Sequence, residues 1–217
     1  MSTTAGSTGK FITLEGGEGA GKSTQIARLV AYLRDAGVDV IATREPGGAP
    51  GAEAIRSLLV EGEPGRWTPL TEALLHSAAR ADHLARTVRP ALAAGTWVVC
   101  DRFTDSTLAY QGFGHGLDAA RLRALNDLVT DGLAPDLTLI LDLPVTVGLA
   151  RAGGRPGAED RYERMGHDFH DRLRQGFLAI AREAPGRCAV IDATQDVDIV
   201  AHAIARTVAQ RLGTRAP

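Results

Sequence analysis

Short apolar runs rich in β-branched residues recur along the chain and alternate with longer amphipathic stretches. The runs occupy 11–14, 38–43, 96–100, 137–143 and 188–193. Each is four to seven residues long, which is typical of a strand buried on both faces of a sheet. The pattern therefore predicts five buried strands.

Helical periodicity fills the intervals between these runs. The predicted helices span 21–36, 50–61, 70–94, about 104–111, 118–131, 145–152, about 160–184 and 196–212. Gly37, Gly95 and Gly132 follow three of them, where a helix C-cap favours a left-handed residue. Strands that alternate with helices indicate an α/β fold, in which a five-stranded parallel sheet carries helices on both faces.

Length and charge narrow the class of protein. The 217 residues suit one domain, which we expect at 10–214 after a disordered segment at 1–9. The formal net charge of -2 gives no overall basic field to recruit nucleic acid or an anionic membrane. No apolar run reaches about 18 residues and the first residues show no leader pattern, which favours a cytoplasmic protein. Cys100 and Cys188 border apolar runs and are interpreted as buried structural residues.

The stretch LEGGEGAGKST, at 14–24, contains the motif G-x-x-x-x-G-K-[ST] between a predicted strand and a predicted helix. This context predicts a P-loop NTPase fold, in which backbone N–H groups and Lys22 hold the phosphates of ATP and the Ser23 hydroxyl binds Mg²⁺. The residues predicted to bind ATP here are Gly16, Gly17, Glu18, Gly19, Ala20, Gly21, Lys22, Ser23 and Thr24. Lys22 is the one cation of this stretch, so further positive charge must come from elsewhere.

Arginines follow the predicted strands at the edge where ligands bind in open α/β sheets. Arg56, Arg80 and Arg102 together suit a second anion site, because guanidinium groups bind a monophosphate bidentately. The alternative is that they are scattered surface arginines. Asp101 ends the third apolar run, as a Walker-B carboxylate does, and is the second predicted Mg²⁺ ligand beside Ser23.

A glycine-rich, cationic segment interrupts the helical pattern near 151–161. Arg151, Arg155 and Arg161 lie in RAGGRPGAEDR, which is typical of a mobile lid that closes over transferring phosphate. We therefore add Arg151 and Arg161 to the predicted ATP ligands.

Beyond the P-loop, the chain resembles the bacterial thymidylate kinase family. The segments that carry the resemblance are LEGGEGAGKST, TREPGG, AAR at 78–80, DRF, STLAYQG, PDLTLILDLP and DRYE, in the order of that family and over nearly the whole length. The resemblance implies transfer of the ATP γ-phosphoryl group to dTMP with Mg²⁺. It also implies a homodimer, with the helices at 70–94 and 118–130 as the candidate interface.

The family comes in two arrangements, which differ in where the additional positive charge lies. One places a basic residue inside the P-loop, whereas the other has glycine there and uses arginines of the lid. Gly19 stands at that position here, so the resemblance implies the lid arrangement, with Arg155 as the first choice. The catalytic residues it implies are Lys22, Glu18, Arg102 and Arg155, where Glu18 contacts the sugar 3′-hydroxyl or organises the Mg²⁺ shell.

The resemblance also implies the residues that bind dTMP. Arg56, Arg80 and Arg102 are assigned to the phosphate and base, Thr107 and Gln111 to the thymine edge, and Tyr110 to the sugar, beside Glu18. His76 stands where many members have phenylalanine. It either stacks on thymine or packs against a neighbouring residue, and it adds a group that ordinarily titrates near pH 6.5.

Two groups of acidic residues resemble metal sites, but we interpret both of them differently. His167 and His170, with Asp168 and Asp171 beside them, are interpreted as a solvated helix face. Asp142 resembles a second Walker-B carboxylate, but Pro144 follows and we expect Asp142 to order the turn into the next helix.

Other P-loop classes fit the sequence less well. A kinase for a different small acceptor remains the main alternative, although an acceptor without a phosphate would not need three converging arginines. A GTPase switch would carry an N-K-x-D stretch, which the sequence lacks, and a transport or recombination ATPase would need further signatures.

Overall fold

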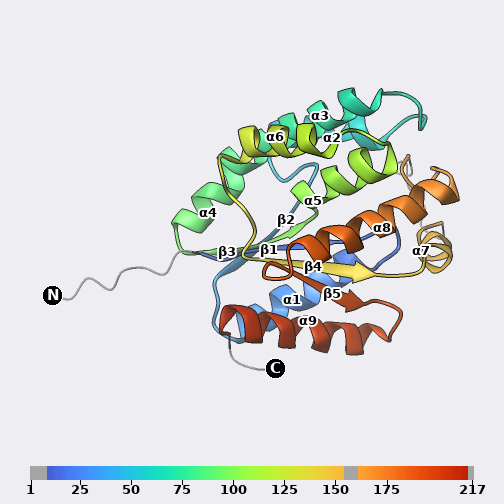
Figure 1. Cartoon of the computed structure of the whole chain (residues 1–217). Coiled ribbons are helices and arrows are strands. Elements are labelled where there is room, and N and C mark those ends of the chain that lie inside the picture. Colours follow the sequence, from blue (N-terminus) through green and yellow to red (C-terminus); the bar gives the residue numbers. More distant parts are fainter. Residues whose placement is uncertain (1–8, 154–160, 215–217) are drawn as a thin grey trace.

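A five-stranded parallel sheet forms the centre of the molecule (Figure 1), in a computed structural model that describes residues 9–153 and 161–214. The strands are β1 (Phe11–Glu15), β2 (Val40–Arg44), β3 (Trp97–Asp101), β4 (Leu137–Asp142) and β5 (Cys188–Asp192). Their order across the sheet is β2-β3-β1-β4-β5. The predicted strands and the parallel sheet are thus confirmed.

Helices cover both faces of this sheet. The α-helices are α1 (Lys22–Asp35), α2 (Pro50–Val60), α3 (Pro69–His83), α4 (Arg89–Ala93), α5 (Thr104–Thr107), α6 (Ala119–Thr130), α7 (Val145–Ala152), α8 (His167–Glu183) and α9 (Val197–Leu212). Helices α1 and α9 lie on one face, while α3, α6 and α8 lie on the other (Figure 1). Leu14, Leu33 and Leu139 belong to the apolar core beneath α1 and α9, and Phe11 and Phe103 to a second core on the opposite face.

Strand order determines where a ligand can bind. Strand β1 pairs with β3 on one side and β4 on the other, so the chain reverses its direction of winding at β1. A crevice forms beyond the carboxyl ends of the strands at such a switch point. The P-loop follows β1 directly and lies at this edge.

The helix predicted at 70–94 contains a π-helical segment, η1 (Leu84–Val88), between α3 and α4. Pro90 lies in the first turn of α4 and has no N–H to donate to Arg86 four residues earlier. The wider π turn accommodates the missing hydrogen bond. A second π-helical segment, η2 (Leu108–Gly114), extends α5 beyond its predicted end.

The helix predicted from about residue 160 begins later, at His167. Gly166 adopts an extended conformation before the helix, with ψ 157°. The predicted lid at 151–161 falls largely on residues 154–160, which lie outside the described residues, as do residues 1–8 of the predicted disordered segment. Gly9 is buried and its N–H donates to the Leu92 carbonyl over 3.1 Å.

Cys100 and Cys188 are both buried, as predicted. Burial raises the pKa of the Cys188 thiol to about 11, so it stays protonated at neutral pH. None of the helices in the described ranges combines the length and the apolar character needed to cross a membrane.

Candidate active site

The P-loop wraps the space in front of α1. Gly21 adopts φ 88°, which turns the chain into α1 at Lys22. The Lys22 ammonium donates to the carbonyl oxygens of Gly16 and Gly17 over 3.1 and 3.0 Å. Lys22 is therefore held against the loop that it is predicted to serve.

Gly19 leaves no room for a side chain. Its φ is 69°, and a Cβ atom there would lie 1.9 Å from the carbonyl oxygen of Gly148 in α7. Such a contact is far inside van der Waals distance, and the backbone atom cannot turn aside as a side chain can. A basic residue at this position is thus excluded by the packing of the P-loop against α7.

A cavity with about 650 Å³ of open space lies beside the P-loop, within the usual range for a small-molecule site. We call it the acceptor cavity. All eight residues predicted to bind dTMP line it: Glu18, Arg56, His76, Arg80, Arg102, Thr107, Tyr110 and Gln111. They come from the P-loop, α2, α3, the turn after β3, and the α5–η2 helix.

A second cavity lies around the P-loop, and we call it the phosphate-loop cavity. Its lining includes Lys22, Ser23 and Asp101. Four residues line both cavities: Glu18, Glu45, Arg56 and Arg102. The two cavities therefore meet at two carboxylates and two guanidinium groups.

Glu18 and Arg102 form the centre of this junction. The Arg102 guanidinium lies 2.9 Å from Glu18 and the Tyr110 hydroxyl donates to the same carboxylate over 2.5 Å. Burial alone would raise the pKa of Glu18, but the charges of Arg102 and Lys22 outweigh it and lower the pKa to about 2. The repulsion expected between Glu18 and phosphate is thus offset by a cation already in contact.

Arg80 is the most constrained of the predicted phosphate ligands. Its guanidinium is buried and donates to Glu45 over 2.7 Å, to Asn126 over 3.2 Å and to Thr107 over 3.1 Å. It also lies over the ring of Phe103, 5.2 Å from the centroid. These contacts fix Arg80 rigidly as part of the cavity wall.

The hydrogen bonding of the Gln111 amide differs from that of Arg80. Its oxygen and its nitrogen are both buried without a hydrogen-bond partner within the described part of the chain. A buried amide offers one acceptor and two donors, and leaving them unpaired is unfavourable. A ligand edge that carries both a donor and an acceptor would satisfy this side chain.

Ser23 and Asp101 provide oxygen ligands at the foot of the phosphate-loop cavity. The Ser23 hydroxyl lies 3.4 Å from one Asp101 oxygen, and the other Asp101 oxygen is buried without a partner among the described residues. A hydroxyl and a carboxylate are the ligands that Mg²⁺ prefers. The donor set therefore fits the predicted metal.

Several known proteins are similar to this chain. The family model for thymidylate kinase matches residues 14–204. The chain is 60% identical over 205 residues to the thymidylate kinase of Caulobacter vibrioides, and the matched region covers 94% of this chain and 98% of that protein. It is 54% identical to the thymidylate kinase of Jannaschia sp., and the matched region covers 93% of this chain and 97% of that protein. The crystal structure of thymidylate kinase from Ehrlichia chaffeensis superposes with a TM-score of 0.77 at 35% identity, covering 93% of this chain and 99% of that chain.

The chain belongs to the thymidylate kinase family. That family phosphorylates dTMP to dTDP with ATP, and this chain is a kinase of that kind. Such a reaction needs a place for each of two substrates, and two adjoining cavities are present.

His76 differs from the phenylalanine of many thymidylate kinases, and its surroundings explain how a histidine is tolerated. It lines the acceptor cavity, and its Nε2 atom lies 3.0 Å from the Tyr162 hydroxyl. That hydroxyl donates to Glu72 over 2.9 Å, so the His76 Nε2–H must donate to the Tyr162 oxygen. Loss of hydration together with the charge of Arg80 lowers the pKa of His76 to about 3, which corrects the expectation of titration near pH 6.5.

We expect the use of dTMP to be insensitive to His76 ionisation. The ratio of kcat/KM for dTMP between the wild type and His76→Phe should stay constant from about pH 5.5 to 8.5, since both rings are uncharged there. A step in the ratio near pH 6.5 would contradict this.

The contribution of His76 to folding stability changes with pH in the opposite direction to that of a histidine paired with an acid. The unfolded chain binds a proton below about pH 6.5 and the folded chain does not, so stability is lost as pH falls toward 3.

Tyr162 and Glu45 were not predicted as site residues. Tyr162 lies in the DRYE motif, and its ring packs edge-on against Tyr110 with centroids 5.3 Å apart. Glu45 lies in TREPGG, and its carboxylate also contacts His83 over 3.0 Å. Both motifs were recognised, so the signal was present, but nothing in the sequence assigned these side chains to the cavity.

Arg151 and Arg161, two of the three arginines predicted to serve the lid, lie among the described residues and have different surroundings. Arg151 lines a third cavity beside Thr24, where it donates to the Ala193 carbonyl over 3.3 Å. Arg155 lies outside the described residues. Arg161 is fully buried, and it donates to Glu72 and to the carbonyls of Leu59, Glu63 and Pro64. Arg161 thus joins the start of the DRYE segment to the end of α2, and these contacts occupy the guanidinium that was predicted to bind ATP.

Breaking the Arg161–Glu72 pair should destabilise the fold strongly. Burial favours a raised pKa for Glu72, but contacts with His115 and Arg161 lower it, so removal of Arg161 leaves a buried charge. We expect Arg161→Met to lower the free energy of unfolding by about 3 to 5 kcal/mol. In urea denaturation the control Arg123→Met, in an exposed pair with Glu183, should change it by less than about 1 kcal/mol. Equal effects of the two would rule out a structural role for Arg161.

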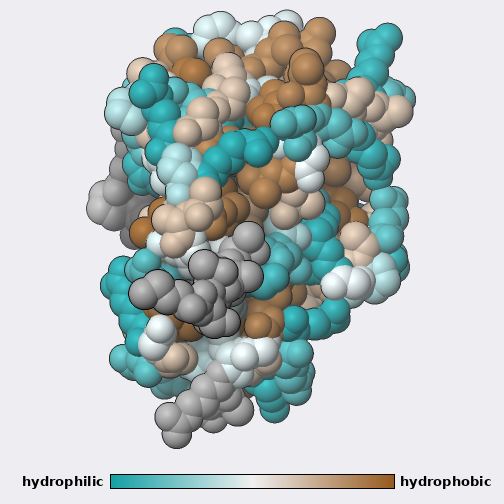
Figure 2. Space-filling view, turned by 90° about the vertical axis from the view of Figure 1, so that its left-hand side faces the viewer, coloured by the Kyte–Doolittle hydropathy of each residue, from teal (hydrophilic) through white to brown (hydrophobic). Residues whose placement is uncertain are grey.

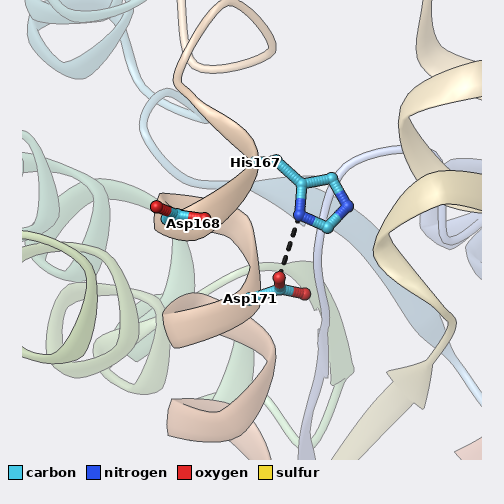
Figure 3. Close-up of side chains that lie close together, drawn as sticks. All are labelled: His167, Asp168 and Asp171. Atoms are coloured by element: carbon cyan, nitrogen blue, oxygen red, sulfur yellow. Dashed lines mark ion pairs between the residues drawn. The ribbon is translucent and has the colours of Figure 1, made fainter.

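The two acidic features that resembled metal sites differ in their surroundings. Figure 3 shows a dashed line between His167 and Asp171 of α8, an ion pair of 2.9 Å, and the ligand atoms of these two residues and Asp168 lie within 4.8 Å of one another. All three are exposed, as expected of a solvated face. His170 is instead buried, so the prediction of solvation was wrong for this residue.

Asp142 forms a two-bond ion pair with Arg174 of α8, with distances of 2.7 and 2.9 Å. Its side chain therefore ties β4 to α8 instead of ordering the turn that follows. The Asp142 carbonyl accepts from the Ala193 N–H.

Proposed function

We propose that the acceptor cavity binds dTMP, that the phosphate-loop cavity binds the phosphates of ATP, and that transfer occurs where the cavities meet. The observation that carries this proposal is that Glu18, Glu45, Arg56 and Arg102 line both spaces. A phosphate oxygen of dTMP attacks the γ-phosphorus of ATP in line, and the bond to the β-phosphate oxygen breaks to release ADP. No covalent enzyme intermediate is involved.

The positive charge for this step comes from several directions. Lys22 reaches the outer phosphates of ATP, while Arg102 faces the junction from the acceptor side. Ser23 and Asp101 would hold Mg²⁺, which supplies charge neutralisation and orientation of the phosphates. We assign the remaining cation to Arg155, because Gly19 cannot carry a side chain.

Recognition of the base rests on groups that need a partner. The unpaired Gln111 amide can bond to the thymine edge, which carries both a donor and acceptors. Thr107 lies next to it in the wall and is held by Arg80. Tyr110, fixed by its hydrogen bond to Glu18, places its ring against the sugar.

A coupled ADP-release assay tests this assignment. The enzyme is supplied with ATP, Mg²⁺ and, in turn, dTMP, dUMP, dCMP, dGMP, thymidine or no acceptor. We expect strong turnover with dTMP alone or with dUMP following it, and loss of turnover when Mg²⁺ is removed. Turnover with thymidine instead of dTMP would contradict the arginine-lined monophosphate site, and hydrolysis without acceptor would contradict a kinase.

We further propose a homodimer that forms in the cytoplasm, where ATP is supplied. Leu70 and Leu74 of α3 and Leu128 of α6 are large apolar residues on the surface, and Leu128 is 80% exposed. Figure 2 shows hydrophobic residues gathered on the upper part of the molecule, at the height of α3 and α6 in Figure 1. Large apolar residues exposed on neighbouring helices favour self-association.

Light scattering of two variants tests the interface. We expect Leu128→Glu to shift the mass from dimer to monomer, because a charge would be buried at the contact. Ile199→Glu is the matched control, since Ile199 is also exposed but lies on α9 on the opposite face of the sheet. A wild-type monomer, or a shift caused equally by both variants, would contradict the proposed face.

A further inference from the structure

Glu15 is a buried carboxyl group that the reaction described above does not use. It is the last residue of β1, it has no exposed surface, and it lines neither the acceptor cavity nor the phosphate-loop cavity. Its Oε1 atom accepts the Phe103 N–H over 2.8 Å and its Oε2 atom accepts the Ser106 hydroxyl over 2.6 Å. Phe103 lies in the turn that follows β3 and Ser106 in helix α5 directly after it, so Glu15 joins the base of the P-loop to that turn and to α5.

The turn that Glu15 holds contains Arg102 in an unusual conformation. Arg102 has φ 69°, one of two positive φ values among the described residues other than glycine. Such left-handed conformations are unfavourable for a long side chain and persist where the surroundings hold them. The Arg102 N–H donates to the Leu14 carbonyl over 3.0 Å, immediately before Glu15. Bonds to two consecutive residues of β1 therefore hold the chain on both sides of Arg102.

The direction of the Arg102 side chain follows from this backbone. Its guanidinium returns to the P-loop, where it donates to the Gly16 carbonyl over 3.1 Å and to Glu18 over 2.9 Å. It also donates to the Ser106 hydroxyl over 3.3 Å, the same hydroxyl that donates to Glu15. Ser106 is therefore a direct bridge between the buried carboxyl group and the guanidinium.

We propose that Glu15 is a positioning residue that holds Arg102 in its left-handed conformation and so aims the guanidinium at the junction of the two cavities. The inference rests on the role given to Arg102 under the proposed function. Glu15 acts through hydrogen bonds to the backbone of Phe103 and to Ser106, and it contacts neither substrate.

The charge state of Glu15 suggests a conservative replacement. Burial, together with the nearby negative charge of Asp105, raises the pKa of Glu15 to about 8. Asp105 itself is paired with Arg187, at 2.6 and 3.0 Å. A glutamine at position 15 has the same shape as a protonated glutamate, and its oxygen can still accept the Phe103 N–H. Methionine fills similar space but accepts no such bond.

Steady-state kinetics of Glu15→Gln and Glu15→Met provide the test. We expect Glu15→Met to lower kcat about 100-fold, comparable to the loss of one aligned transition-state donor, with the KM of ATP and of dTMP within about threefold. Glu15→Gln should keep kcat within about threefold of the wild type, since the bond to Phe103 remains. A wild-type kcat in Glu15→Met, or a Glu15→Gln variant as impaired as Glu15→Met, would overturn the proposal.

A double-mutant cycle decides the question even if Glu15→Met does not fold. Ser106→Ala removes the bridge with little change in volume, and we expect it to lower kcat about 10-fold in the wild type but not in an Arg102→Met background. Additive effects of the two changes would overturn the proposal, because Ser106 would then act independently of Arg102. If Arg102→Met itself leaves kcat unchanged, the catalytic role of Arg102 in the proposed function fails instead.

Discussion

Replacing Lys22 with methionine is expected to lower kcat about 1,000-fold, the upper range for the loss of a single group that stabilises the transition state. Lys22 is 8% exposed and is directed by bonds to Gly16 and Gly17 into the phosphate-loop cavity. Burial lowers its pKa, with Arg102 as the next cause, so part of its stabilisation depends on the anions that surround it. Methionine keeps the aliphatic stem in place and removes the charge.

Single-turnover kinetics with saturating ATP measure this effect separately from product release. Lys10 is the other lysine of the chain, and it forms a surface pair with Asp136 over 2.9 Å. Lys10→Met is therefore a matched control and should leave the rate within about twofold of the wild type. A Lys22→Met enzyme that keeps a tenth or more of the wild-type rate would show that Lys22 is not the main cation of the P-loop.

Replacing Arg155 with alanine should also lower kcat about 1,000-fold, the lower end of the range for an arginine that contacts the transferring phosphoryl group. The reason lies in Gly19 and Gly148. Their close approach prevents a basic side chain inside the P-loop, so the charge that other arrangements place there must come from another segment. Of the arginines near the lid, Arg161 is held by Glu72 and Arg151 by the Ala193 carbonyl, which favours Arg155 for this task.

Arg151→Ala is the comparison variant for Arg155→Ala. Because Arg151 lines the cavity beside Thr24, we expect Arg151→Ala to raise the KM of ATP while changing kcat by less than about 10-fold. Arg155→Ala should change kcat much more than the KM of dTMP. A larger loss of kcat in Arg151→Ala than in Arg155→Ala would transfer the catalytic role to Arg151.

The sequence contains enough local information to predict the sheet and the phosphate-binding edge. Strand length, helix period and glycine positions are properties of neighbouring residues, and they predicted β1 to β5 and the turn from β1 into α1. The residues around the acceptor cavity were implied by the resemblance to the thymidylate kinase family, whose motifs lie at fixed spacing from a strand or helix. Thr107, Tyr110 and Gln111, for example, follow β3 within one helical segment.

Contacts between distant segments were decided by the tertiary structure. Arg161 is set among glycine, proline and acidic residues, as a lid cation would be, yet its partner Glu72 lies 89 positions away on α3. His167 and His170 lie three residues apart on the same helix, but the packing of α8 buries only His170. The partners of Glu15 lie 88 and 91 positions away, in the turn after β3 and in α5. The sequence determined which groups could bind phosphate, whereas the fold decided which of them face the substrates, because burial and pairing depend on the elements packed against each side chain.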